Sequence, residues 1–173
     1  MNKAGKYLIG GTVALVAVQA VRKGVAASKA VPKFLFPRNF KIKNWFLSFD
    51  MPFRIVNTDT TAYTVQSLGG RINYDAGKAG VYEFGSYSIA QPITVKPNNS
   101  DVYTAQFNTY LPDTISCLRA MLPVIAKPLN FRIVGNVSFL AIPIPYDQPL
   151  QFSLPTPVVA AIKTVLNLFK NKN

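Results

Sequence analysis

The chain has 173 residues, of which 49% are hydrophobic, 12% aromatic and 15% charged, a composition that fits one globular domain with short appendages and argues against disorder. No apolar stretch runs uninterrupted for about 18 residues, which argues against a polytopic membrane protein. The sequence has no histidine and one cysteine, Cys117. These absences exclude histidine-based catalysis, Cys-His nucleophiles, His/Cys zinc sites and an intramolecular disulfide. We therefore expect no enzyme, no cofactor, no metal and no small-molecule substrate.

The net charge of +12 is concentrated at the two ends of the chain. Residues 44–160 balance seven basic against seven acidic side chains, and the last thirteen residues add three lysines. The first 43 residues hold no acidic side chain and nine basic ones: Lys3, Lys6, Arg22, Lys23, Lys29, Lys33, Arg38, Lys41 and Lys43. A neutral body with cationic ends indicates arms that meet an anionic surface, which is phospholipid, nucleic acid or acidic protein. Any contact with nucleic acid is expected through the arm and not through the folded body.

An apolar run from Tyr7 to Val21 lies between basic flanks near the N-terminus. As a helix, its fifteen residues rise about 22 Å, which is short of a hydrocarbon core about 30 Å thick. Three alternatives follow: attachment to a membrane, a helix packed on a protein partner, or a cleaved signal peptide that makes the protein secreted after loss of residues 1–20. The expected attachment residues are Lys3, Lys6, Leu8, Ile9, Val13, Leu15, Val16, Val18, Arg22 and Lys23.

Three regions are expected: a basic hydrophobic N-terminal helix and arm at 1–38, a β-domain at 39–155, and an amphipathic helix at 156–173. From about Asn39 the apolar residues alternate with period two, which is typical of strands. The expected strands are Asn39 to Phe49, Met51 to Asn57, Tyr63 to Tyr74, Gly80 to Ser88, Pro92 to Pro97, Val102 to Leu111, and Leu129 to Ile142 as the longest. This spacing predicts an all-β antiparallel sandwich or barrel.

Other local signals fall between and within these strands. Gly69-Gly70 suits a β-bulge, and the segment from Asp75 to Gly77 has the chemistry of a hairpin turn. A short helix is expected over residues 113–126, capped by Asp113 and bent at Pro123. Cys117 in this helix is expected to be a small buried side chain.

Four of these segments together resemble the type 2 late-embryogenesis-abundant domain, also called the water stress and hypersensitive response (WHy) domain. They are Phe53 to Asp59, Val65 to Tyr74, Val95 to Phe107 and Phe131 to Val137. The resemblance covers about 110 residues and carries no catalytic signature. This chain has Asn57-Thr58-Asp59 where the family favours an Asn-Pro-Asn turn. The resemblance implies an immunoglobulin-like or fibronectin-like β-sandwich, often tethered behind an N-terminal hydrophobic segment, with a binding or protective role.

The C-terminal residues show a clear helical period. Thr156 suits an N-cap and Pro157 the first helical position. One face is wholly apolar and comprises Val158, Val159, Ile162, Val165, Leu166 and Phe169. Two alternatives are open: this stripe packs on the chain's own sandwich, or it docks on a partner subunit or membrane surface.

Two functional classes remain. The first is a non-enzymatic structural or binding module, attached through its basic hydrophobic N-terminus to an anionic membrane or a larger assembly. The alternative is a minor structural subunit of a virus particle (virion), whose basic arm contacts internal lipid, neighbouring subunits or packaged nucleic acid. The expected location is accordingly at a membrane or within a larger particle.

Overall fold

The computed structural model describes residues 31–139 and 142–170. These residues form one antiparallel sheet of nine strands. The strands are β1 (Lys33–Phe34), β2 (Arg38–Lys43), β3 (Phe46–Asn57), β4 (Tyr63–Asp75), β5 (Val81–Ser88), β6 (Ile93–Val95), β7 (Asn99–Tyr110), β8 (Leu129–Phe139) and β9 (Ile142–Phe152). The all-β antiparallel class expected from the period-two pattern is confirmed.

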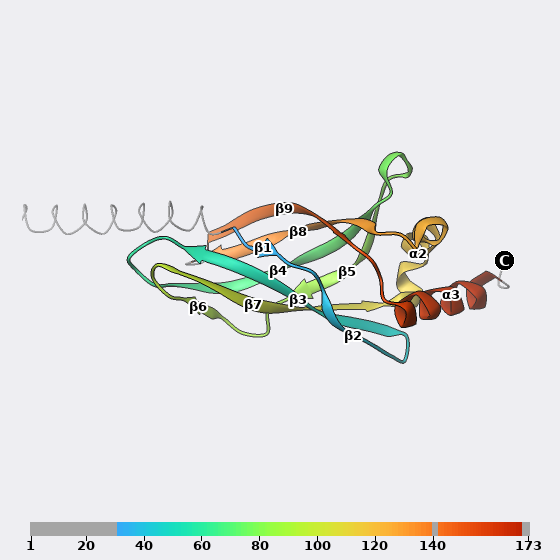
Figure 1. Ribbon diagram of the computed structural model, residues 1–173, viewed down its shortest axis with the longest axis horizontal. Coiled ribbons are helices and arrows are strands. Elements are labelled where there is room, and N and C mark those ends of the chain that lie inside the picture. Colours follow the sequence, from blue (N-terminus) through green and yellow to red (C-terminus); the bar gives the residue numbers. More distant parts are fainter. Residues whose placement is uncertain (1–30, 140–141, 171–173) are drawn as a thin grey trace, which may run out of the picture.

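The sheet is continuous and curls until its two edges nearly meet (Figure 1). Its order is β1-β3-β7-β5-β4-β8-β9, with β2 also paired to β3 and β6 to β4. At the seam between β1 and β9, the side-chain amide of Gln148 accepts from the backbone N–H of Phe34 (3.4 Å) and donates to the backbone oxygen of Pro32. One polar side chain thus bridges edges that are not joined in the strand pairing.

Two strands were expected between Asn39 and Asn57, with a break at Asp50, but β3 runs through that position without interruption. The chain turns instead at Asn44-Trp45, a two-residue turn with φ of 51° and 67°, and Lys43 pairs with Phe46 across it. Two positive φ values are what a tight hairpin with right-handed strand twist requires. β3 then continues through Pro52, whose carbonyl faces Leu35 in the gap between β1 and β2. Its missing N–H faces the same gap, so the ladder to β7 is undisturbed.

β9 was not expected, because its sequence carries three prolines. Pro143, Pro145 and Pro149 are all exposed and all face Ser138, Asn136 and Arg132 of β8 in register. β9 pairs on one side only, and an edge strand tolerates prolines. The expected strand to Ile142 in fact ends at Phe139, and the longest strand is β4 with 13 residues.

Gly69 and Gly70 do not form the expected bulge. The register shifts of β4 fall between Val65 and Ser67 and between Ile72 and Asn73. The glycines serve close strand contact instead, since a Cβ on Gly70 would lie 2.1 Å from the backbone oxygen of Val134. The expected hairpin after Asp75 is confirmed: its carboxylate accepts from the N–H of Gly77 (2.8 Å), the first residue of η1 (Gly77–Ala79).

The helices cover one end of the sheet (Figure 1). They are η2 (Leu111–Thr114), α2 (Ile115–Met121), η3 (Leu122–Val124) and α3 (Thr156–Lys170). Asp113 does not cap α2; it lies inside η2, and Thr114 occupies the N-cap position. The expected C-terminal helix is confirmed from Thr156. No helix within residues 31–139 and 142–170 is both long and apolar enough to cross a bilayer.

The core is rich in aromatic rings. Phe107 stacks on Phe49 at 4.1 Å and on Phe84 at 5.3 Å, and Phe34 of β1 lies 5.7 Å from Tyr146 of β9 across the seam. β1 and the first residue of β2 lie within the segment 1–38 that was expected to be an arm. Burial of Phe34 (6% exposed) makes this part of the segment integral to the domain.

Candidate anionic-surface interface

Alternate side chains of β3 point to the core and to the outer surface. Leu47, Phe49 and Phe53 are buried, whereas Phe46, Arg54 and Val56 are exposed. Strand pairing places β1 and β2 on one side of β3 and β7 on the other. Residues that pair with the outward positions of β3 face outward with them, because side chains directly opposite in a ladder share a face.

This outward surface carries five basic side chains, all exposed, which we name the cationic face: Lys33, Arg38, Lys41, Lys43 and Arg54. Their positions follow from the register of the ladders. Lys33 lies opposite Arg54, and Lys41 lies opposite Ser48. Lys43 lies opposite Phe46. The face therefore extends along β3 from one end to the other.

Asp50 is the acidic residue within this face, and its charge is held by amides. Its carboxylate accepts from the side-chain N–H groups of Asn39 (2.6 Å) and Gln106 (2.8 Å). These hydrogen bonds, and then the charges of Arg38 and Lys41, hold the pKa of Asp50 below its usual value. Asp50 therefore stays ionised near neutral pH and fixes Asn39 and Gln106 without closing an ion pair.

The basic residues of the face lack ion-pair partners in the described part of the chain, where the ion pairs are Arg71–Glu83 (3.3 Å) and Arg132–Asp147. Lys33 and Arg54 even lie directly opposite one another. Like charges in that position are destabilising. The domain alone does not neutralise this surface.

Apolar side chains are interleaved with the charges. Phe46 (56% exposed) packs against Tyr110 of β7, with ring centroids 4.8 Å apart. Val56 and Val102, which flanks Arg54 in the ladder, are each 48% exposed. The surface is thus basic and partly apolar, a combination suited to the interface of a lipid bilayer.

The attachment residues expected between Lys3 and Lys23 lie outside the described residues. The apolar stripe of α3 packs inside the chain, the first of its two alternatives: Val158, Ile162, Val165 and Leu166 are buried. Val159 and Phe169 are half-buried at its margins. Lys33 and Arg38 were expected in the arm of residues 1–38, and Lys41 and Lys43 were counted with its charge. All four belong to strands of the sheet.

Arg54 was missed as a member of this site, since it was counted in the electrically neutral region. The outward direction of the Arg54 side chain can be inferred from the sequence, because its neighbours Phe53 and Ile55 are apolar. Its position beside Lys33 cannot be inferred in this way, because the two residues are 21 positions apart and meet only through the pairing of β1 with β3.

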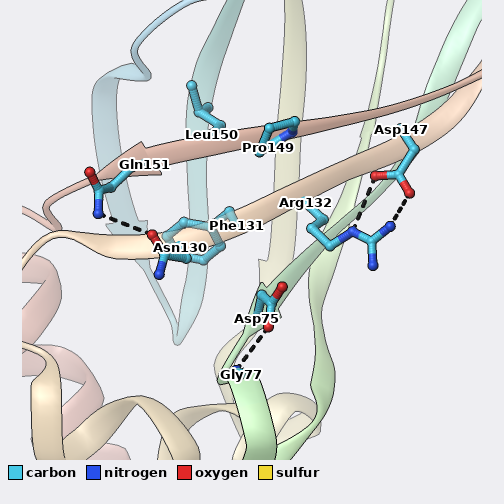
Figure 2. A pocket seen from close by; sticks show the side chains of 9 residues that line it. All are labelled: Asp75, Gly77, Asn130, Phe131, Arg132, Asp147, Pro149, Leu150 and Gln151. Atoms are coloured by element: carbon cyan, nitrogen blue, oxygen red, sulfur yellow. Dashed lines mark hydrogen bonds and ion pairs between the residues drawn. The ribbon is translucent and has the colours of Figure 1, made fainter.

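A large surface hollow lies elsewhere, on the outside of β8 and β9 (Figure 2). It is an open groove with a volume of about 770 Å³. Four of its polar side chains bond to one another in pairs, Arg132 with Asp147 and Gln151 with Asn130 at 3.0 Å. Asp75 accepts from the backbone N–H of Gly77. No group of three or more His, Cys, Asp or Glu side chains that could hold a metal ion occurs in the described ranges. The groove therefore offers little that would fix a ligand.

Buried groups that titrate are neutral at physiological pH. Burial raises the pKa of the Cys117 thiol to about 12, so the expectation of a small buried side chain is confirmed and a reactive thiolate is disfavoured. Tyr87 and Tyr146 share a buried hydrogen bond between their hydroxyls, and burial raises the pKa of both. Both hydroxyls lie beside Gly135, where a Cβ would meet them at 2.7 and 2.9 Å.

Comparison with known proteins gives structural likeness only. No family profile matches the sequence, and no curated protein matches it. Among solved structures, a protein from Archaeoglobus fulgidus is similar with a TM-score of 0.46 and 12% identity, covering 71% of this chain and 98% of that one. The structural genomics target SoR45 has a TM-score of 0.37 and 12% identity, covering 73% and 84%. A FixG-related protein from Vibrio parahaemolyticus has a TM-score of 0.37 and 10% identity, covering 73% and 98%.

Proposed function

We propose that this protein is a non-enzymatic binding or structural module that is held to an anionic membrane, or to a larger assembly with an anionic surface, through its basic hydrophobic N-terminal segment. The observation that carries the proposal is the cationic face. The domain presents five exposed cations on β1, β2 and β3, and none of them forms an ion pair within the described residues. Asp50 lies opposite Arg38 and offsets part of this charge. The remaining excess of positive charge favours an external partner of the other sign.

Two terms contribute to attachment in this proposal. The cations supply an attraction that salt screens, with a Debye length of about 8 Å at physiological ionic strength. The apolar run from Tyr7 to Val21 supplies a term that salt does not remove, at about 25 cal/mol per Å² of buried apolar surface. The two terms separate experimentally.

The test is sedimentation of the full chain with vesicles of phosphatidylcholine alone or mixed with phosphatidylglycerol. We expect binding to the anionic vesicles that persists in about 1 M salt, where the Debye length is about 3 Å. Leu15→Asp and Val16→Asp should release the protein, whereas Asn2→Asp, outside the apolar run, should not. Failure to bind anionic vesicles under any salt condition contradicts the membrane form of the proposal. Tight binding to nucleic acid in its place would favour the particle subunit.

The finer description of the fold, an immunoglobulin-like sandwich of the WHy type, is also a proposal. It is supported by the antiparallel pairing of all strands and by the place of Asn57, which ends β3 as the first residue of the family's turn does. An experimental structure tests it at the seam between β1 and β9. A backbone ladder across that seam means a closed barrel, and its absence means two facing layers.

A further inference from the structure

The cationic face is as long as the strand that carries it. Lys33 and Arg54 lie near the Asn57 end of β3, and Lys43 lies beside Phe46 at the other end. Arg54 and Phe46 are eight positions apart, which at about 3.3 Å per residue separates the two ends of the face by about 26 Å. A partner that meets all of its cations must be anionic over that whole length.

The placement of Lys33 opposite Arg54 indicates that the domain functions with an anionic partner bound to this face. Two cations directly opposite in a ladder repel each other, and the nearest neighbour of Arg54 on its other side is the uncharged Val102. A negatively charged surface over the face converts that repulsion into two attractions. The outer residues Ser48 and Asn108 are neutral. Asp50, opposite Arg38, is the acidic side chain of the face, and the five cations outnumber it.

The apolar members of the face distinguish lipid from nucleic acid. Val56 and Val102 are each 48% exposed and Phe46 is 56% exposed. Bases stack on aromatic rings, but exposed valines offer them no stacking platform. The headgroup boundary of a bilayer takes basic and apolar side chains together, so the composition of the face favours a membrane.

We propose that the cationic face lies flat on an anionic phospholipid bilayer, with β3 parallel to the membrane plane. The domain then makes its own contact with lipid in addition to the N-terminal segment, and it is not merely suspended from that segment. This inference rests on the proposed function and adds the orientation of the domain and the chemistry of its partner.

Charge neutralisation with a matched control is the first test. The face variant combines Lys41→Gln, Lys43→Gln and Arg54→Gln, and the control combines Lys78→Gln, Lys127→Gln and Lys163→Gln. All six side chains are exposed, and both variants lower the net charge by three. A basic residue near an anionic surface contributes about fivefold in binding. We expect the face variant to bind mixed phosphatidylcholine–phosphatidylglycerol vesicles about 100-fold more weakly, and the control about threefold or less, because its three lysines do not belong to the face and salt screens charges away from the contact.

The second test needs no variant, because Trp45 is the sole tryptophan in the sequence. It lies in the β2–β3 turn, between Lys43 and Phe46 and at the far end of β3 from Lys33. Vesicles that carry brominated acyl chains should quench its fluorescence if the face lies flat. A domain suspended from residues 1–30 holds this turn tens of ångströms from the lipid and leaves the fluorescence unchanged.

The outcomes separate the two proposals. A selective loss in the face variant together with quenching of Trp45 supports the inference. Equal losses in both variants, or unquenched Trp45 in protein that is bound to anionic vesicles, overturn the flat orientation and leave the proposed function standing. Absence of binding by the unaltered chain overturns the inference together with the membrane form of the proposed function. If the face variant loses binding to DNA but keeps its binding to vesicles, the assigned partner is wrong.

Discussion

Asn57 is predicted to hold together the end of the sheet where β3 finishes. It is 2% exposed, and its side-chain amide donates to the backbone oxygens of Thr61 (2.9 Å) and Lys96 (2.9 Å). Its carbonyl oxygen accepts from the backbone N–H of Asp59 (2.9 Å). One buried side chain therefore links the β3–β4 connection to the connection between β6 and β7.

Asn57→Asp keeps the acceptor and replaces the donating NH2 group with oxygen. Each lost hydrogen bond contributes about 1 kcal/mol, and a buried carboxylate against two carbonyl oxygens adds a further penalty. We expect the free energy of unfolding to fall by about 3 to 5 kcal/mol at pH 7, measured by urea denaturation with Trp45 fluorescence and circular dichroism.

The pH dependence of this variant provides a second check. The site favours the protonated acid, so the folded-state pKa of the new carboxyl is raised above its unfolded value of about 3.9. The deficit relative to the unaltered protein should therefore be smallest below that pH and grow as the pH rises through it. Asn136→Asp, on the exposed surface of β8, is the matched control and should change stability by less than about 0.5 kcal/mol. A loss under about 1 kcal/mol for Asn57→Asp would refute the assigned role.

Two further predictions concern packing and alkaline pH. Gly70→Ala should destabilise the domain by about 3 kcal/mol or more in a urea titration, because its Cβ would lie 2.1 Å from the backbone oxygen of Val134 and strands cannot separate locally without loss of their ladder. The control Ser67→Ala, at an exposed position of the same strand, should be near neutral. An equal effect of the two substitutions would contradict the close approach of the strands at Gly70. Burial raises the pKa of Tyr63 and of Cys117 each to about 12, above unfolded values of about 10 and 8.5. The folded chain then retains protons that the unfolded chain releases, so stability should be constant at neutral pH and fall progressively above about pH 8.5; a urea midpoint unchanged up to pH 12 would be inconsistent with buried phenols and thiol.

Local sequence patterns were sufficient to predict those strands and helices that bury one face and expose the other. The alternation in Val102 to Leu111 predicted β7, and the apolar stripe after Thr156 predicted α3, because each residue's environment follows from the geometry of its own element. β9 escaped prediction because its prolines oppose a strand locally, and only its position at the edge of the sheet makes them harmless. The role of Gly70 was likewise missed, because close contact with Val134 is a property of two strands.

The same division applies to the candidate site. The gathering of cations before residue 44 could be read from the residue order alone. So could the placement of Lys41 and Lys43 on one side of a strand, since alternate residues of a strand point the same way. The strand pairing, in contrast, was needed to show that Lys33 and Arg38 belong to the sheet rather than to an arm, and that Arg54 joins them. Pairing between strands depends on which edges can bury their aromatic residues together, as Phe34 does against Phe53 and Tyr146. That is a property of the whole core, so no window of the sequence contains it.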